Sequence, residues 1–376
     1  MEAIIFQGDK KSTLSEKYIE LEIKRFFYHK EKQPRYKKDL GLDERVNQIV
    51  NVLADKRNII KGFKPSNETL ERIKNNISNC INTSSPIGIV ISWGCIKTPN
   101  FCQDGIDIAE FIALEQFINI NQKVLEYYDK GMEFNIFLGD EWYDFIYGYR
   151  KGIEDYCSGF EKLIEIMNLE NIQVSRLSYI INYSDKDRLI EKAKRYFESL
   201  KWYWSDSEKI PEKDWTKLES YNSLVKTGFK GILPNIMREF FIDKMNRYLP
   251  NAGFQEKLEA IWRYFAYGLM IIDEDLLGRN KCAIDFSLIS PPPGAPDKCI
   301  FDHRLRMRSM PYEATKKGYA PWVSGGIIIS EEGNFRPSSI TDYDLQKYIL
   351  IQPAILKVFN NKKYLNLSAD IYIKNF

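Results

Sequence analysis

The sequence predicts an α/β protein with a mostly parallel sheet and helices on both of its faces. Two observations support this class. Short apolar runs rich in β-branched residues alternate with amphipathic stretches between residues 86 and 181, and strand-like runs return after residue 280. Parallel strands need long crossover connections, and the amphipathic stretches can provide them. We therefore expect a Rossmann-like sheet, preceded by a helical region and interrupted by a helical insertion.

The N-terminal part of the chain is expected to be helical. Residues 12–30 and 43–60 carry apolar residues at helical spacing, and a third such segment begins at Asn67, a residue type that favours helix starts. This pattern predicts a helical N-terminal region over residues 1–82. The remainder, residues 83–376, is predicted to form the Rossmann-like catalytic domain.

The central segment has the pattern of three strands separated by two helices. The expected strands cover residues 86–93, 132–140 and 172–181, and the expected helices cover residues 106–131 and 149–169. The first helical segment is long and amphipathic, and it ends at a glycine. The strands are almost continuously apolar, which is typical of a sheet buried on both faces.

The second half of the chain begins with the expected insertion. Residues 185–272 are mostly helical in pattern and rich in Trp and Tyr. Three further strands are expected at residues 282–289, 299–308 and 325–330, and we expect them to join the same sheet.

Composition excludes several classes of function. The 376 residues include 54 Lys plus Arg and 52 Asp plus Glu, and a net charge of +2 gives no field that would draw nucleic acid or an anionic membrane to the whole surface. No apolar stretch approaches the roughly 20 residues of a membrane helix, and the first residues lack the features of a signal peptide. We expect a cytoplasmic protein with no nucleic-acid or membrane partner.

The sequence offers no metal or nucleotide motif. Its only histidines, His29 and His303, are far apart, and none of its six cysteines forms a CxxC pair. Neither GxGxxG nor the P-loop pattern occurs. The expectation is a protein without a bound metal or cofactor, with its cysteines as reduced thiols.

Two loops of the predicted sheet carry the first candidate site residues. In open α/β sheets, ligands bind at the carboxyl ends of the strands. Lys97 and Asn100 follow the first strand, Glu110 begins the next helix, and Asp140 follows the second strand, so all four could reach one crevice. A lysine there could hold a phosphate or form an imine. The alternative is that Lys97 is solvated and Asp140 caps a turn.

A second group of candidates lies in the late strands. Arg304, Arg306 and Arg308 alternate along an expected strand, so they would share one face and suit a phosphate or carboxylate. An exposed edge strand protected by charge explains the same pattern. Further along, Trp322 precedes a Gly325–Gly326 pair, which allows a close approach of the backbone to a ligand or simply makes a turn.

The segment ISWGCIKTPNFCQDGIDIAEF, residues 91–111, resembles the isocyanide (isonitrile) synthase family, which includes the pyoverdine/paerucumarin-type synthase and the yeast dityrosine enzyme. That family carries a similar Lys-Ser-Pro-Asn loop followed by an acidic helix start, matched here by residues 97–100 and then by Asp107 and Glu110. Asp140 falls on the acidic residue after the family's next strand. Trp322 falls on the Pro-Trp of its last motif, and the resemblance runs from about residue 86 to 336.

The resemblance implies an enzyme that converts the α-amino group of an amino acid to an isocyanide, with ribulose 5-phosphate as carbon donor and no cofactor. Imine formation, proton transfer and a phosphate clamp would be needed. The implied catalytic residues are Lys97, Glu110 and Asp140; the implied substrate-binding residues are Asn100, Arg304, Arg306, Arg308 and Trp322. The partners would be these small molecules, and a homodimer is one assembly open to the chain.

The chain departs from the family at two places. It has residues 285–289, Asp-Phe-Ser-Leu-Ile, where a late strand of the family usually carries Arg and His, and Val323 where a His follows the Pro-Trp. Two alternatives therefore stay open. One is the same fold acting on another phosphorylated or acidic small molecule, and the other is a non-catalytic binding relative.

Overall fold

The computed structural model describes the greater part of the first 180 residues and the strands of the C-terminal half. The described residues are 34–37, 39–59, 67–95, 105–140, 152–180, 188, 191, 249–253, 256, 260, 263, 284–287, 305–306, 326–331, 334–339, 348–360 and 363–374. The expected helix at residues 12–30 and nearly all of the insertion expected at 185–272 lie outside them.

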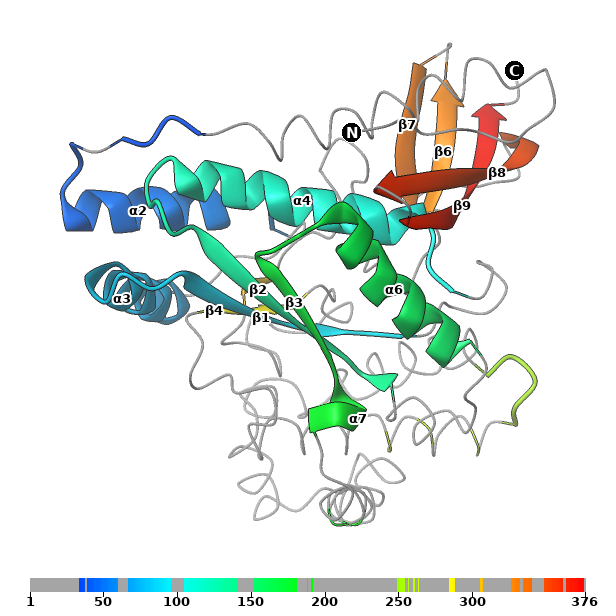
Figure 1. Ribbon diagram of the computed structural model, residues 1–376, viewed down its shortest axis with the longest axis horizontal. Coiled ribbons are helices and arrows are strands. Elements are labelled where there is room, and N and C mark those ends of the chain that lie inside the picture. The colour runs from blue at the N-terminus through cyan, green and yellow to red at the C-terminus, as the bar shows by residue number, and fades with distance from the viewer. Residues whose placement is uncertain are drawn as a thin grey trace, which may run out of the picture.

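A five-stranded parallel sheet forms the centre of the fold (Figure 1). Its strands are β1 (Ile87–Trp93), β2 (Met132–Leu138), β3 (Ile172–Arg176), β4 (Ile284–Ser287) and β5 (Leu305–Arg306), in the spatial order β3-β2-β1-β4-β5. Seven consecutive residue pairs join β1 to β2, from Ile87 with Met132 to Trp93 with Leu138. The carboxyl ends of these two strands are therefore level, and the predicted α/β class is confirmed.

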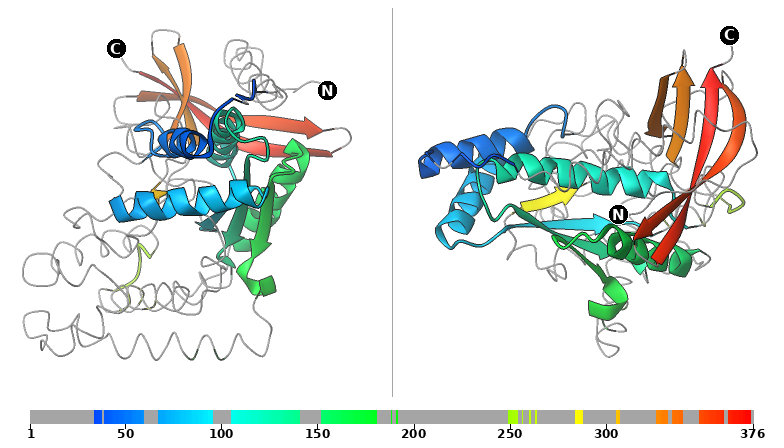
Figure 2. Two further views of the ribbon diagram at one scale, coloured as in Figure 1. Left: turned by 90° about the vertical axis from the view of Figure 1, so that its left-hand side faces the viewer. Right: turned by 45° about the horizontal axis from the view of Figure 1, so that its top comes forward.

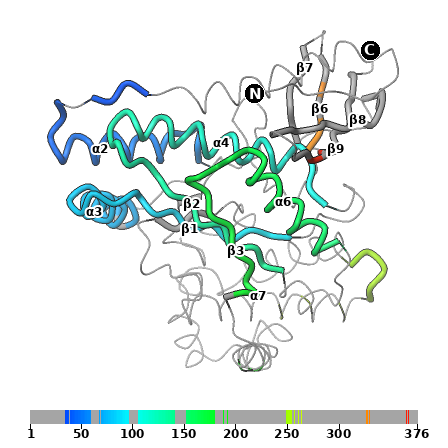
Figure 3. The backbone as a smooth tube through the Cα atoms, in the orientation of Figure 1, coloured from blue at the N-terminus to red at the C-terminus, as the bar shows by residue number. Residues whose placement is uncertain are grey.

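Two crossover helices cover one face of this sheet. Figure 3 traces the chain from β1 through α4 (Ile108–Leu125) to β2, and from β2 through α6 (Ile153–Met167) to β3. The ring of Trp93 on β1 contacts Phe117 of α4 and Phe160 of α6, with ring centroids 6.3 and 4.7 Å apart. Both helices therefore pack on the same face, and a further helical layer on the opposite face stays a prediction.

Two of the expected boundaries were wrong. The helix expected to reach residue 131 ends at Leu125, and the third strand ends at Arg176 rather than residue 181. A single helical turn, α7 (Leu177–Ile180), follows β3 directly. The backbone N–H and the hydroxyl of Ser178 both donate to Asp140, which comes after β2. The Asp140 side chain, which follows the neighbouring strand β2, thus holds the start of this helical turn, at which the chain leaves the sheet.

The helices α2 (Leu42–Leu53) and α3 (Asn67–Asn82) confirm two of the expected N-terminal helices. α2 packs on both α3 and α4. In addition, the Gln116 amide of α4 donates a hydrogen bond to Oδ1 of Asn58, a residue that follows α2, over 3.2 Å. Because the sheet covers one side of α4 and α2 the other, nearly every residue of α4 is buried. The N-terminal helices thus pack directly on the α/β layer, and the boundary expected at residue 82 stays a prediction.

A second sheet stands at one end of the molecule (Figure 2). It contains β6 (Gly326–Glu331), β7 (Asn334–Ser339), β8 (Tyr348–Asn360) and β9 (Lys363–Lys374), in the order β7-β6-β9-β8. The expectation that residues 325–330 join the parallel sheet was wrong. Strand β6 pairs antiparallel with β7, which follows after two residues, and parallel with β9. A nearby antiparallel partner needs only a short turn, whereas joining the first sheet would need a long crossover.

None of the described helices combines the length and apolar character needed to cross a bilayer.

Candidate functional site

The order of the parallel strands identifies one place on the sheet. The chain runs from β1 outward to β2 and β3, and then continues on the other side of β1 with β4 and β5. The direction of strand addition therefore changes between β1 and β4. In open α/β folds, ligands bind outside the carboxyl ends of the strands at such a switch point. The loop that follows β1, residues 94–105, begins there.

A buried chain of hydrogen bonds lies behind this edge. The indole N–H of Trp93, the last residue of β1, donates to the Tyr156 hydroxyl over 2.8 Å. That hydroxyl donates to Glu110 Oε1 over 2.9 Å, and Glu110 and Tyr156 are completely buried. Burial first, and then the charge of Glu110, raise the pKa of Tyr156 well above its usual value. Tyr156 therefore stays a neutral phenol, and its hydroxyl donates a hydrogen bond to the Glu110 carboxylate.

Glu110 also takes part in the start of α4. Its Oε2 accepts from the backbone N–H of Asp107 at 2.8 Å, while the Asp107 carboxylate accepts from the N–H groups of Ala109 and Glu110. This reciprocal pair is a capping box, which satisfies N–H groups that the first helical turn leaves without partners. Glu110 is thus held by two elements, α4 and α6.

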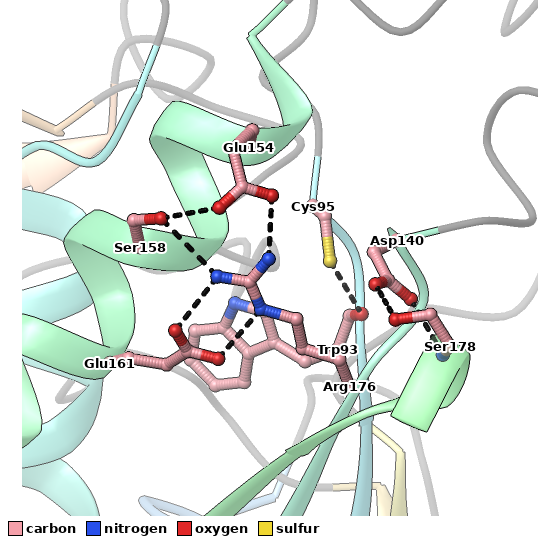
Figure 4. A network of polar contacts seen from close by, with 8 residues as sticks. All are labelled: Trp93, Cys95, Asp140, Glu154, Ser158, Glu161, Arg176 and Ser178. Atoms are coloured by element: carbon pink, nitrogen blue, oxygen red, sulfur yellow. Dashed lines mark hydrogen bonds and ion pairs between the residues drawn. The ribbon is translucent and has the colours of Figure 1, made fainter. Parts of the chain in front are cut away.

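Asp140 joins the carboxyl ends of β2 and β3 and lies beside that of β1 (Figure 4). Its side chain accepts from the Ser178 N–H at 3.1 Å and from the Ser178 hydroxyl. The preceding Gly139 donates its N–H to the carbonyl oxygen of Trp93 at 3.0 Å. Asp140 is 8% exposed, against 0% for Glu110.

Cys95 lies between these groups. Its thiol donates to the Trp93 carbonyl oxygen over 3.7 Å, and the side chain is fully buried. Burial is the main cause that raises the pKa of Cys95 well above its usual value, followed by its contact with Cys157; the charge of Asp140 adds to the effect. Cys95 therefore stays a neutral thiol, which does not suit it to act as a nucleophile.

Arg176, at the end of β3, is a buried cation at this edge and was not among the sequence-based candidates. Its guanidinium binds both oxygens of Glu161 at 2.7 and 2.8 Å, one oxygen of Glu154 at 2.6 Å, and the Ser158 hydroxyl (Figure 4). These bonds, with Glu161 first, raise its pKa. A signal was present in the sequence: Glu154, Ser158 and Glu161 recur at spacings of four and three and so share one helix face. Arg176 therefore links β3 to α6 through ion pairs with Glu154 and Glu161.

The structure places part of the predicted site. Glu110 and Asp140 both lie at the carboxyl edge, and Arg306 belongs to β5 of the same sheet. Because Phe286 pairs with both Ile91 and Leu305, Arg306 is level with Ser92, one residue before the end of β1. The other candidates lie outside the described residues: Lys97, Asn100, Arg304, Arg308 and Trp322.

The described residues contain no group of three or more His, Cys, Asp or Glu side chains that could hold a metal ion. The buried carboxylates of Glu110 and Asp140 accept hydrogen bonds from backbone N–H and hydroxyl groups instead.

The fold is similar to that of a protein of known structure. The crystal structure of the PvcA protein from Pseudomonas aeruginosa matches with a TM-score of 0.54, covering 89% of this chain and 100% of that one at 15% sequence identity. At that identity the likeness shows the fold alone. Tyrosyl-tRNA synthetase from Pyrococcus horikoshii, complexed with L-tyrosine, matches 64% of this chain and 49% of its own at 14% identity, and its TM-score of 0.29 carries no argument. No protein-family model and no curated protein matches the sequence.

Proposed function

We propose that this chain is an enzyme of the isonitrile synthase type, with its site at the carboxyl edge of the parallel sheet between β1 and β4. Two independent lines support the proposal. The motif of residues 97–100 and the following acids resembles the isocyanide synthase family, and the fold is similar to that of PvcA. The proposed substrates are an amino acid and ribulose 5-phosphate.

One contact carries the proposal. The Gly326 N–H donates to the Asp107 carboxylate at 3.1 and 3.2 Å, across 219 residues of sequence. Asp107 comes directly after the loop that holds Lys97 and Asn100, and Gly326 comes four residues after Trp322. The two segments that resemble family motifs therefore meet at the N-terminus of α4, next to the switch point of the sheet.

The roles of the candidate residues follow from their chemistry. Lys97 would form an imine or hold the phosphate, and Arg306 with its neighbours Arg304 and Arg308 would bind the phosphate. Asn100 and Trp322 would contact the amino acid. These assignments rest on the sequence and on the position of the loops.

Of the two carboxylates, Asp140 is the stronger candidate for proton transfer. Both carboxylates accept hydrogen bonds at both of their oxygens, but Asp140 retains some exposure, whereas Glu110 has none. A general base must come within hydrogen-bond reach of the proton it takes. Glu110 would then act on the site by its charge and by fixing the start of α4.

The test is product analysis. Purified protein is incubated with pooled amino acids and with ribulose 5-phosphate labelled with ¹³C, and the products are examined by mass spectrometry. The expected product is one amino acid that has gained a single labelled carbon and lost two hydrogens. Absence of label from every amino acid, with a protein shown to be folded by circular dichroism, would refute the proposed reaction.

A second candidate function is favoured by the chain's departures from the family. Strand β4 lies beside β1 at the switch point and contains Asp285, in register with Val90, where the family usually carries Arg and His. An acidic residue in this strand fits a different small molecule. Thermal-shift measurements with a panel of phosphorylated and acidic metabolites would identify it: a shift with another compound and none with ribulose 5-phosphate would favour this candidate.

A further inference from the structure

The Asp107 carboxylate binds more than the helix that it caps. It is 5% exposed and accepts from the N–H groups of Ala109, at 2.7 Å, and Glu110. It also accepts from the N–H of Gly326, the first residue of β6. Two of these three donors belong to α4 itself, and the third belongs to the second sheet. One side chain therefore both begins α4 and binds the second sheet to it.

Gly326 is the residue that makes this approach possible. A Cβ at this position would lie 2.4 Å from Ile108 Cγ2 and 2.5 Å from the Ala109 nitrogen. Because the second atom belongs to the backbone, a side-chain rotation could not relieve the contact. Glycine is therefore required here by the close packing of β6 on α4, a reason different from both the ligand contact and the turn expected from the sequence.

We infer that Asp107 is a positioning residue for the proposed reaction. It follows the loop that contains Lys97 and Asn100, and its partner Gly326 follows the segment that contains Trp322. The Asp107 carboxylate holds Gly326 against the first turn of α4, so it fixes the distance between the points where these two segments enter α4 and β6. The inference rests on the proposed function, because the segments matter only if they carry the site.

One substitution separates capping from positioning. Asparagine caps helices about as well as aspartate, so Asp107→Asn keeps an acceptor for the Ala109 N–H. The substitution also replaces one carboxylate oxygen by an NH₂ group. Of the two oxygens that face the Gly326 N–H in the wild type, one is then a donor and can no longer accept from it. Asp107→Ala, in contrast, removes both the cap and the contact with β6.

The experiment compares steady-state kinetics of the wild type with those of Asp107→Asn and Asp107→Ala. If Asp107 positions the two segments, both variants lower kcat by about 10-fold to 100-fold while KM changes little, since the side chain does not touch substrate. A matched control is Asp55→Asn, which alters an aspartate that binds Arg57 at the end of α2. It should keep wild-type kinetics.

The outcomes are distinct. Wild-type kcat in Asp107→Asn, with loss only in Asp107→Ala, would mean that Asp107 is merely a cap and would overturn the inference. A wild type without turnover would instead refute the proposed function, and the inference with it. If Asp107→Asn does not fold, Asp107→Ser takes its place, because its hydroxyl can cap while the second acceptor is missing.

A stability measurement tests the contact without relying on turnover. Asp107→Asn and Gly326→Ala should each lower the thermal midpoint, and the double variant should lower it by less than the sum of the two single effects, because both weaken the same contact. Additive shifts would show that the two residues act independently and would overturn the inference.

Discussion

The two edges of the parallel sheet are closed by different kinds of side chain. At the amino edge, Asn121 Oδ1 accepts from the N–H of Met132, and the Tyr128 hydroxyl donates to the carbonyl oxygens of Ser85 and Cys80. At the carboxyl edge, the buried groups include the carboxylates of Asp107, Glu110 and Asp140 and the guanidinium of Arg176. These amino-edge groups are uncharged at pH 7, whereas the buried groups of the carboxyl edge include carboxylates and a guanidinium.

This difference bears on function. Burying an ionisable group requires hydrogen-bond partners that replace water, and the net gain in stability is small or negative. The amino edge shows that amides and hydroxyls suffice to close the turns of this sheet. The concentration of charge at the carboxyl edge therefore supports the placement of the site there, and substitutions matched between the two edges can test it.

The largest expected effect is on activity. Lys97→Met should abolish turnover while leaving the thermal midpoint nearly unchanged, because a loop lysine contributes little to the core. The matched control is Lys130→Met, at an exposed turn before β2 on the opposite edge, which should retain full activity. Product formation by mass spectrometry and a thermal melt of each variant would check this. Full activity of Lys97→Met would remove the chemistry from this loop, and loss of folding would make Lys97 structural.

The next effect is on the stability of the carboxyl edge. Tyr156→Phe removes the hydroxyl that bridges Trp93 and Glu110, so a buried N–H and a buried carboxylate oxygen each lose a partner. The free energy of unfolding should fall by about 1–3 kcal/mol. Urea unfolding at neutral pH would measure it. A change below about 0.5 kcal/mol would show that other partners replace the hydroxyl.

A smaller effect is expected at a glycine of the amino edge. Gly131 has a φ of +59°, and a Cβ there would lie 2.7 Å from Asn121 Oδ1. Gly131→Ala should lower the free energy of unfolding by about 1–2 kcal/mol from the backbone conformation alone. The comparison is Gly253→Ala, where the nearest atom to the added Cβ would be 3.7 Å away. Equal stability of the two variants in urea unfolding would contradict the prediction.

The smallest effect is at Tyr128, the counterpart of Tyr156 on the amino edge. Tyr128→Phe should lower the free energy of unfolding by about 0.5–1.5 kcal/mol at pH 7. Burial, followed by the charges of Cys80 and Asp129, raises the pKa of Tyr128 from 10.0 to about 12. As the pH rises, Tyr128 therefore ionises in the unfolded chain before it ionises in the folded protein. The stability that depends on the neutral phenol is lost as the pH rises from 10 to 12.

The pH dependence gives this prediction its own control. The difference in unfolding free energy between wild type and Tyr128→Phe should be largest below pH 10 and should shrink above it, because only the wild type has this group to ionise. Urea unfolding of both proteins at pH 7 and pH 11 would measure the change. A difference that grows with pH would contradict the assigned direction of the pKa shift.

Local pattern determined much of this protein. The apolar runs that became β1, β2 and β4 and the amphipathic stretch that became α6 are visible in the sequence, because burial of one face imposes a period on the residues that form it. The segment that became α4 was also expected to be a helix, although it is buried on most of its surface and not on one face alone. The acidic pair of Asp107 and Glu110 also marks the start of α4 within four residues, and Asp140 was placed at a strand end by position alone.

Only the tertiary structure decided which distant groups meet. Tyr156 donates to Glu110, Ser178 donates to Asp140, and Arg176 binds α6. Strand β6 belongs to the second sheet and contacts the start of α4 through Gly326. No periodic pattern in the sequence predicts these contacts. Each joins residues whose separation in sequence depends on the path of the whole chain and not on the geometry of one helix or strand. Periodicity records which face of a segment is buried, whereas the partner of a buried polar group is fixed only when the segments pack.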